Sequence, residues 1–318
     1  MLMVAVVAAA GRGDDLTTTH RREPMTDLTV DQGVRLRRPA GIRSIRLGET
    51  KVSYVPDGDV RLRPLELLPD TTAEVWAAHP EYLDPAGRLV GSVGALLVEH
   101  GDRALLIDAG FGPQSLQLPE GPLDTIHGGA LPAALADLGR RPEDVEAVAF
   151  THLHADHLGW ACHPAPGSDR LAFAHADHLI SGPEWERRDL LEAQGMAEQV
   201  RTLAPRVRTV ADGQEVFPGV RVRITPGHTV GHAEYVITGG GRRLIAFGDA
   251  LHSPIQVDRP EWSSGFDHDR ALTADHRRRL VAELAEPGTL GFGVHFADVV
   301  FGHVRHDGTG PAWRPLDA

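Results

Sequence analysis

The stretch Thr151–Trp160, with the sequence THLHADHLGW, brings together four side chains that could bind a metal ion, namely His152, His154, Asp156 and His157. Neutral imidazole and carboxylate groups are the usual nitrogen and oxygen ligands of zinc. In an extended segment side chains alternate between two faces, so His152, His154 and Asp156 can point the same way. Where the chain turns, Asp156 and His157 can serve a neighbouring ion. The alternative is a histidine-rich surface loop in a chain that contains 18 histidines.

Further potential ligands follow apolar runs elsewhere in the chain. The THLHADH stretch itself comes directly after the apolar run 145–150, which predicts a buried strand. Asp108, His228, Asp249 and His295 each lie just beyond another such run. Several strands therefore deliver polar side chains to one edge of a sheet, and this repeated position favours a metal site over a surface loop. Asp108 is the expected partner that orients a ligand histidine.

The elements that must position these residues are strands and helices in a mixed order, which indicates an α/β fold in a single domain. Strands are expected at 42–47, 52–55, 93–98, 104–107, 145–150, 171–174, 207–210, 220–224, 235–237, 244–247 and 290–294, with 93–98 and 104–107 forming a hairpin. Helices are expected at 130–138, 183–194 and 269–285, the second largely solvated. The triplet Pro56-Asp57-Gly58 predicts a turn, and residues 65–88 predict a long irregular loop that walls a pocket or packs on the surface.

Composition excludes several classes of function. With 318 residues and 42% hydrophobic composition, the chain can bury a large core. Its formal net charge of −12 disfavours a nucleic-acid partner, because phosphate binding draws on clustered Lys and Arg. No apolar run approaches the roughly 20 residues that cross a bilayer, so no membrane partner is expected. The single cysteine, Cys162, precludes an intramolecular disulfide, and we interpret it as a small buried residue rather than a ligand or nucleophile.

The first 40 residues are interpreted as a disordered or misassigned leader. The opening MLMVAVVAAAGRG has a short apolar run that ends in small residues, but it lacks the positive region that precedes such a run in a secretory signal. Residues 11–40 are polar and rich in arginine, and Met25 offers a later start, so it stays open whether residues 1–24 belong to the mature protein. A cytoplasmic location is the default expectation.

The chain resembles the metallo-β-lactamase superfamily, whose signature is a strand-end His-x-His-x-Asp-His followed by a distant His, a bridging Asp and a final His. The segments THLHADH, TPGHTVGH and FGDALH carry the resemblance, which assigns residues 41–318 to one hydrolase domain. It implies a four-layer αββα sandwich with the metals at one edge of the paired sheets. It also implies that His152, His154 and His228 hold one ion, that Asp156, His157 and His295 hold the other, and that Asp249 bridges them.

Other histidines compete for these places. His232 lies four residues after His228, and the family pattern gives it a supporting role behind the ligands. His175 and His178 are interpreted as structural or surface residues, because the family binds no metal there. His303 is a less favoured candidate than His295 for the final metal ligand.

The same resemblance implies a hydrolase. Two divalent ions, expected to be Zn²⁺, about 3.5–4 Å apart would share a bridging hydroxide that attacks a lactone, an ester or a phosphotriester. Asp249 and Asp156 are the expected catalytic residues, and either Asp156 or a metal-bound water protonates the leaving group. The nearest branch contains methyl-parathion hydrolase and quorum-quenching lactonases. The lactonases commonly carry Tyr three residues after the bridging Asp, where this chain has His252.

Several alternatives stay open on the sequence. A small molecule is the expected partner, and a homodimer is not decided. Trp76, Phe111, Trp160 and Trp262 could line an apolar pocket or belong to the core. A mononuclear iron oxidoreductase resembling persulfide dioxygenases would use a subset of the same ligands. A glyoxalase II-like thioesterase would keep them all but add a helical C-terminal domain, and a metal-stabilised binding protein would leave the ligand set unused.

Overall fold

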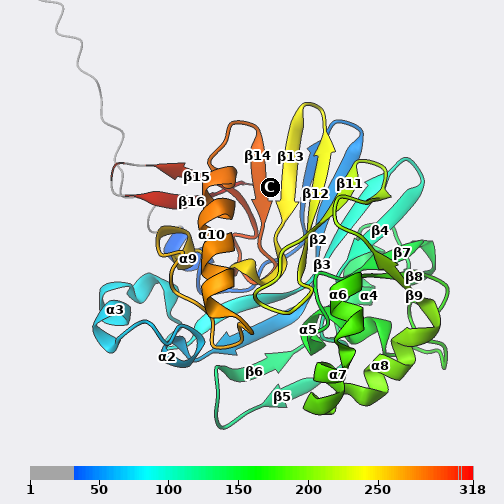
Figure 1. Cartoon of the computed structure of the whole chain (residues 1–318), viewed down its shortest axis with the longest axis horizontal. Helices are drawn as coiled ribbons and strands as arrows, with labels where there is room; N and C mark the ends of the chain where they lie inside the picture. Colours follow the sequence, from blue (N-terminus) through cyan, green and yellow to red (C-terminus); the bar gives the residue numbers. More distant parts are fainter. Residues whose placement is uncertain (1–31, 307, 309, 318) are drawn as a thin grey trace, which may run out of the picture.

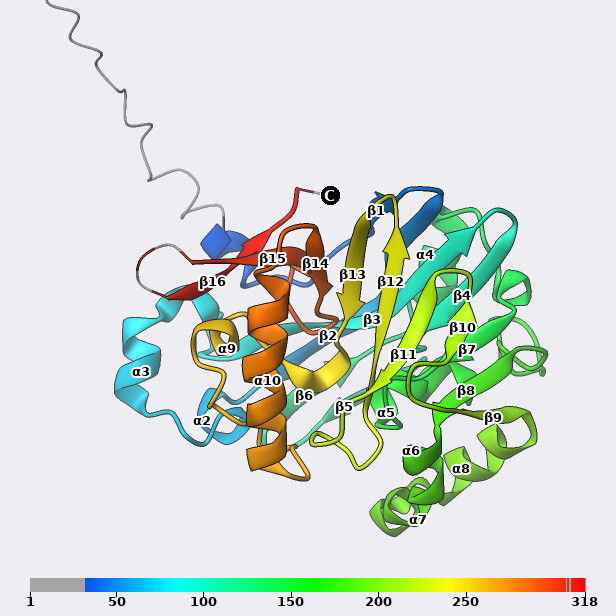
Figure 2. The ribbon, with the colours of Figure 1, turned by 45° about the horizontal axis from the view of Figure 1, so that its top comes forward.

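The computed structural model describes residues 32–317 except 307 and 309. Two β-sheets pack against each other, and helices cover their outer faces (Figures 1 and 2). The helices are α2 (Pro64–Leu67), α3 (Ala73–Ala78), α4 (Leu131–Asp137), α5 (Ala155–Leu158), α6 (Gly182–Glu186), α7 (Arg188–Leu191), α8 (Ala197–Leu203), α9 (Ile255–Asp258) and α10 (Arg270–Leu284). Short turns of other helix types include η4 (Glu192–Met196) and η6 (Gly248–Ala250).

The first sheet has nine strands within the described residues, in the order β5-β6-β2-β3-β4-β7-β8-β9, with β1 paired to β2. They are β1 (Arg43–Leu47), β2 (Thr50–Leu62), β3 (Leu89–His100), β4 (Arg103–Ile107), β5 (Ser115–Gln117), β6 (Leu123–His127), β7 (Ala147–Ala149), β8 (Asp177–Ser181) and β9 (Val207–Val210). The antiparallel β3–β4 pair is the predicted hairpin. Strands β4, β7, β8 and β9 are parallel, so their C-terminal ends lie at one edge of the sheet.

The second sheet has seven strands within the same described part of the chain, in sequence order from β10 to β16. They are β10 (Glu215–Phe217), β11 (Val220–Ile224), β12 (Ala233–Gly239), β13 (Arg242–Ala246), β14 (Thr289–Phe292), β15 (Phe301–His306) and β16 (Pro311–Pro315). Because β11 and β13 both run antiparallel to β12, and β14 runs parallel to β13, the ends of β11, β13 and β14 share one edge.

Alternating side chains on the strands fill separate cores, which produces the layers. In β3, Leu96 and Val98 pack between the two sheets, whereas Leu97 packs under α4 and α8 on the outer face of the first sheet. In the second sheet, Leu244 faces the space between the sheets and Ile245 packs with residues of α10. The order helix, sheet, sheet, helix is the predicted four-layer αββα sandwich.

Three local predictions were wrong. The triplet Pro56-Asp57-Gly58 is not a turn: β2 continues to Leu62, and its register with β3 shifts between Pro56 and Gly58. Such a bulge accommodates a proline, which cannot donate to the ladder. Residues 65–88 are not irregular throughout, because they contain α3 and parts of other helical turns. The strand expected at 171–174 is an isolated bridge, and the true strand β8 begins at Asp177.

The part of the predicted leader that the structure describes packs on the domain. Residues 32–35 are helical, and the side chains of Leu36 and Ala40 are 4% and 5% exposed. Both belong to apolar cores of the sandwich. Residues 32–40 therefore contribute to the fold, while residues 1–31 lie outside the described part of the chain.

Candidate metal centre

The residues predicted as metal ligands gather where the two sheets present the C-terminal ends of their strands. They fall into two groups of neighbouring side chains, His152, His154, His228 and Asp249 in one and Asp156, His157 and His295 in the other. In the first sheet β7 ends at this edge, and in the second β11, β13 and β14 end there. Residues far apart in sequence meet because loops that follow parallel strands lie at the same edge.

The first group is a cluster of imidazole nitrogens. His152 Nε2 lies 2.9 Å from His154 Nδ1, and His228 Nε2 lies 3.1 Å from the same atom. Nitrogen ligands roughly 2.0–2.1 Å from a tetrahedral zinc ion are roughly 3.3 Å from one another, close to the spacing seen here. A single proton on His154 Nδ1 could be shared with one of these neighbours only, whereas one metal ion would satisfy all three lone pairs.

The short helix α5 divides the THLHADH stretch between the two groups. The alternation of faces expected from His152 to Asp156 ends at His154, because Ala155–Leu158 turns as a helix. Asp156 and His157 therefore join His295 in the second group, although the ring centres of His157 and His152 lie only 4.1 Å apart. The extended spacing predicted from the sequence holds for the first two histidines only.

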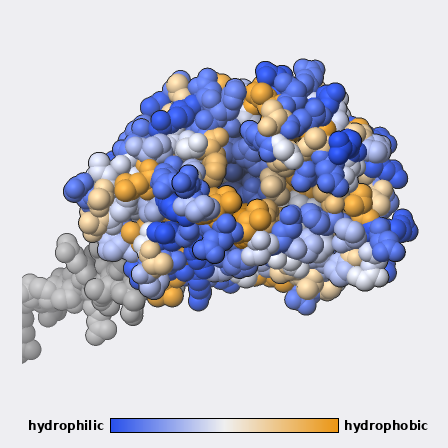
Figure 3. All heavy atoms as spheres, turned by 90° about the horizontal axis from the view of Figure 1, so that it is seen from below, coloured by the Kyte–Doolittle hydropathy of each residue, from blue (hydrophilic) through white to orange (hydrophobic). Residues whose placement is uncertain are grey.

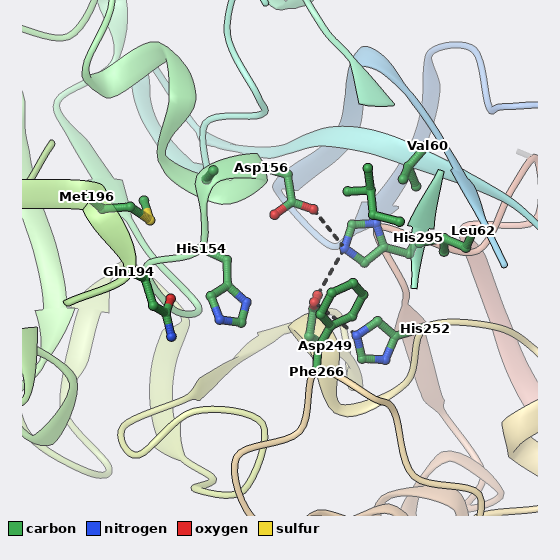
Figure 4. A pocket seen from close by; sticks show the side chains of 12 residues that line it. Val60, Leu62, His154, Asp156, Gln194, Met196, Asp249, His252, Phe266 and His295 are labelled. Carbon is green, nitrogen blue, oxygen red and sulfur yellow. Dashed lines mark ion pairs between the residues drawn. The ribbon is translucent and has the colours of Figure 1, made fainter. Parts of the chain in front are cut away.

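The second group contains one carboxylate and two imidazoles. Asp156 Oδ2 lies 3.6 Å from His295 Nε2 and 3.8 Å from His157 Nε2. Figure 4 shows the carboxylates of Asp156 and Asp249 both directed at the His295 ring. These nitrogen and oxygen atoms are of the types that bind zinc.

Asp249 connects the two groups. Its Oδ2 lies 3.3 Å from His228 Nε2 and 3.8 Å from His152 Nε2. Its Oδ1 lies 3.1 Å from His295 Nε2 and 3.3 Å from His157 Nε2. Each oxygen of the carboxylate thus faces one group, which is the arrangement that a bridging ligand requires.

Burial and neighbouring charges set the protonation of the cluster. Burial, followed by the adjacent imidazoles, holds the pKa of His152 well below its ordinary value and lowers the pKa of His154 to about 3. Both rings are therefore neutral at pH 7, as metal-binding imidazoles must be. Burial acts against the charged form of Asp249 as well, but the imidazoles around it, His295 first, bring its pKa well below the ordinary value.

Two buried atoms of the ligand groups, His157 Nε2 and Asp249 Oδ1, make no hydrogen bond of good geometry among the described residues. Burial opposes the charged form of His157, yet the surrounding carboxylates, Asp249 first, raise its pKa well above the ordinary value, so an ion bound at this ring would have to displace a proton. Leaving such groups unpaired in a buried site is costly. The donor set and these two atoms fit divalent metal ions.

Asp108 has the orienting role that the sequence predicted. Its Oδ2 lies 2.9 Å from His157 Nδ1, and its Oδ1 accepts a hydrogen bond from the Thr151 backbone N–H at 2.8 Å. The φ angle of Asp108 is 62°, a left-handed conformation that is unusual outside glycine. Such conformations persist where the surroundings enforce them, as the bonds to Thr151 and His157 do here.

Asp267 is a functional residue that sequence reasoning missed. Its Oδ1 lies 3.0 Å from His228 Nδ1, so it fixes the orientation of that ring. Its Oδ2 accepts a hydrogen bond from Arg277 Nη1 at 3.2 Å, and the Arg277 side chain is fully buried. No local signal identifies this triad, because His228 and Asp267 are 39 residues apart in sequence.

Glu184 was also missed, because its helix was expected to be largely solvated. The residue is only 6% exposed and joins two ligand loops. Its Oε1 accepts a hydrogen bond from the Leu153 N–H at 3.2 Å, and its Oε2 accepts from Thr229 Oγ1 at 2.7 Å and from the Gly231 N–H at 2.9 Å. The loop of His152 and the loop of His228 are thereby held together.

The competing histidines do not enter either group. His232 Nε2 accepts a hydrogen bond from the Asp249 backbone N–H at 3.1 Å, so it supports the bridging residue from behind, as expected. The neighbouring Gly248 has φ 51°, and a Cβ there would lie 2.7 Å from His232 Nε2, which explains why a glycine precedes Asp249. His178 and His303 lie in β8 and β15.

A cavity of about 410 Å³ lies over the metal centre. It is lined by Val60, Leu62, Leu123, His154, Ala155, Asp156, Gln194, Met196, Asp249, His252, Phe266 and His295. Figure 4 shows His154, Asp156, Asp249 and His295 across the middle of this space, with Met196 beyond His154 at one end and Val60 and Leu62 beside His295 at the other. On the face shown in Figure 3 the surface is hollowed, and hydrophobic side chains lie along part of the rim.

The aromatic residues considered as pocket walls belong to the core instead. Trp76, Phe111 and Trp160 are 4%, 3% and 2% exposed and pack in apolar cores, and Trp262 packs against one of these. None of the four lines the cavity, where Phe266 is the aromatic side chain. Residue type alone does not separate a core aromatic residue from a pocket one, because the same apolar ring suits both places.

Comparisons with known proteins identify relatives of this chain among metal-dependent and lactone-cleaving enzymes by name. An N-acyl homoserine lactonase from Bacillus sp is 27% identical over 220 residues, which cover 64% of this chain and 82% of the lactonase. A probable metallo-hydrolase of Mycobacterium tuberculosis is 28% identical over 184 residues, covering 51% of this chain and 58% of that protein.

Solved structures share the fold across most of the chain. The dizinc quorum-quenching lactonase AidC, in complex with a product, N-hexanoyl-L-homoserine, superposes with a TM-score of 0.75 at 20% identity, covering 88% of this chain and 99% of AidC. The hydrolase AbOPH superposes with a TM-score of 0.72 at 25% identity, covering 88% of this chain and 98% of AbOPH. Residues 88–290 match the metallo-beta-lactamase superfamily. The predicted family is thus confirmed, and the chain belongs to the metallo-β-lactamase superfamily.

Proposed function

We propose that this protein is a dinuclear metal-dependent hydrolase that opens a lactone carrying an apolar acyl chain. The observation that carries the proposal is the pair of ligand groups joined by Asp249 at the base of an apolar cavity. The relatives named N-acyl homoserine lactonase support a lactone over a phosphotriester.

The ligand assignment follows the two groups. His152, His154 and His228 would hold one ion, Asp156, His157 and His295 would hold the other, and Asp249 would bridge them. Two zinc ions suit this set, since imidazole nitrogen and carboxylate oxygen are their common ligands. When bound, such a pair supplies a hydroxide nucleophile near neutral pH and polarises the carbonyl under attack.

The side chains of the cavity determine which molecule can react. Val60, Leu62, Leu123, Met196 and Phe266 provide apolar walls, which would bind an acyl chain and exclude water from it. Each buried methylene contributes about 0.8 kcal/mol, or about fourfold in affinity.

Polar groups on the cavity wall can complete the reaction. Asp156 lines the cavity with a side chain that is 23% exposed, and its pKa is lowered: burial acts to raise it, but the adjacent His157 and His295 outweigh burial. The carboxylate is therefore ionised near neutral pH, and from its place on the cavity wall it can take up the proton of the nucleophile and pass it to the leaving oxygen. His252 Nε2 lies 3.2 Å from Asp249 Oδ2, and its Nδ1 is buried without a hydrogen-bond partner among the described residues.

A kinetic series tests the proposed substrate. For zinc-loaded protein, kcat/KM should rise by up to about fourfold per methylene as the acyl chain of an N-acyl lactone lengthens, until the cavity is full. Leu123→Ala should reduce this gain, whereas Leu116→Ala should not, since Leu116 belongs to the neighbouring strand β5, is 48% exposed and does not line the cavity. Faster turnover of phosphotriesters than of any lactone would overturn the substrate assignment.

The bridging residue tests the reaction itself. Asp249→Ala removes the carboxylate that faces both ligand groups. Bound metal and turnover should both fall, and unchanged turnover would exclude the two-metal mechanism.

A further inference from the structure

We propose that the N-terminal segment 35–43 positions a metal ligand, because it binds the loop that carries His295. The contact is a clamp formed by Arg35, Arg38 and Arg43 on the single residue Asp298. The inference rests on the proposed function, in which His295 is a metal ligand.

The clamp contacts both the side chain and the backbone of Asp298, whose side chain is 2% exposed. Arg38 Nη2 lies 2.6 Å from Asp298 Oδ2, and Arg43 Nη2 lies 2.6 Å from Asp298 Oδ1. Arg35 Nε donates to the Asp298 carbonyl at 3.0 Å, and the Asp298 N–H donates to the Arg35 carbonyl at 3.2 Å. Every oxygen of Asp298 is thus bonded to the N-terminal segment.

Ser92 of β3 links the same segment to the imidazole of His295. The Ala40 N–H donates to Ser92 Oγ at 2.8 Å, and this hydroxyl donates to the Ala297 carbonyl at 2.8 Å. The Ser92 carbonyl oxygen lies 2.9 Å from His295 Nδ1. The bond at Nδ1 leaves Nε2 directed at Asp249, as metal binding requires.

The loop needs such support because its backbone is strained. Ala297 has φ 41°, in the left-handed region that alanine rarely adopts. Its N–H donates to the His295 carbonyl at 2.9 Å, so the strained residue directly shapes the turn that presents the ligand. Strained residues persist where neighbours enforce them, and here Ser92 and Asp298 hold the two sides of Ala297.

The clamp acts on one ligand group only. His295 belongs to the second group, with Asp156 and His157. Within the described residues, Asp298 forms its side-chain ion pairs with Arg35, Arg38 and Arg43, and the loops that carry the first group are not among these partners. Removing a contact of the clamp should therefore weaken the binding of one metal ion and leave the binding of the other unchanged. A general loss of stability would weaken the binding of both.

The test is titration of metal-free, full-length protein with cobalt(II), followed by its visible absorption. The wild type should take up two equivalents. In Asp298→Asn one equivalent should bind about tenfold more weakly, the lower end of the effect of residues that orient ligands, while the other is unchanged.

A matched control is Glu99→Gln. Glu99 is also a poorly exposed carboxylate held by two cations, Lys51 at 3.1 Å and Arg140 at 2.9 Å. It lies on β3 seven residues beyond Ser92, roughly 23 Å away along an extended strand. Glu99→Gln should therefore leave the affinity for both cobalt equivalents unchanged.

A second variant covers the case in which Asp298→Asn does not fold. The Arg38 side chain is 55% exposed, so Arg38→Gln removes its ion pair with Asp298 without disturbing the core. Arg38→Lys keeps the charge and should bind the second cobalt equivalent more tightly than Arg38→Gln does. Two equivalents bound as tightly as in the wild type by Arg38→Gln or Asp298→Asn would overturn the clamp. Equal weakening of both equivalents would also overturn it, since that is a general structural effect. If the wild type itself bound no metal, the proposed function would fail instead.

Discussion

The Asp57 carboxylate should be among the most costly side chains in this protein to neutralise. It is 1% exposed and accepts five hydrogen bonds. Its Oδ2 accepts from the N–H groups of Phe111 at 2.7 Å and Gly112 at 3.0 Å. Its Oδ1 accepts from the N–H groups of Gly129 at 2.9 Å and Leu131 at 3.0 Å, and from Trp160 Nε1 at 2.8 Å.

Asp57→Asn changes the shape of this side chain very little but replaces one acceptor oxygen by a donor. If the remaining oxygen keeps the three bonds of Oδ1, the new NH₂ group faces the N–H groups of Phe111 and Gly112. Two buried donors are then unsatisfied, at about 1–3 kcal/mol each, so the free energy of unfolding should fall by about 2–6 kcal/mol. Trp160 closes the segment that carries the metal ligands, so local unfolding there should also release metal early.

Equilibrium unfolding in urea measures this loss, with Asp84→Asn as the control. Asp84 also accepts two backbone N–H groups, from Ala86 at 2.8 Å and Arg88 at 2.9 Å, but through Oδ1 alone. An asparagine can keep both bonds, and the substitution removes only the ion pair of Oδ2 with Arg61 Nε at 3.5 Å, so this variant should lose less than about 1 kcal/mol. If Asp57→Asn cost no more than Asp84→Asn, the assignment of Asp57 as a buried acceptor of five bonds would be refuted.

Two further variants test the centre and its surroundings. Asp267→Asn should lower zinc affinity by about 10- to 100-fold, because Asp267 orients His228, and competition with a chromophoric chelator would reveal it; unaltered affinity would exclude that role. Cys162→Ser should leave metal content and turnover unchanged. Burial, with a smaller contribution from Glu198, raises the pKa of the Cys162 thiol to about 12, so at pH 8 about one molecule in 10⁴ carries the thiolate. Labelling of the folded protein by a thiol reagent should therefore be slow, and rapid labelling would contradict the raised pKa of this partly buried thiol.

The sequence identified most of the side chains that gather at the centre because the relevant signal is local. His152, His154, Asp156 and His157 lie in one short stretch, and Asp249 and His295 follow apolar runs that proved to be strands. A strand end fixes both the position and the direction of the residue after it. Asp108 was predicted for the same reason.

The residues that hold the ligands in place could not be predicted in this way. Asp267, Glu184 and Asp298 have no motif of their own, and each acts on a partner loop that only the folded chain brings close. Asp57 was misinterpreted because Pro56-Asp57-Gly58 has the composition of a turn. The long pairing of β2 with β3 overrides that preference and makes it a bulge.

Within the described residues no helix is long and apolar enough to cross a membrane.

Metal content per chain of freshly purified protein, measured together with lactone hydrolysis, tests the central claim most directly. The two groups joined by Asp249 predict about two zinc ions, or other divalent ions that support hydrolysis, and turnover that stops when a chelator removes them. About one iron ion, oxygen consumption and no hydrolysis would contradict the account in favour of a persulfide dioxygenase-like oxidoreductase. No bound metal at all would contradict the ligand assignment itself.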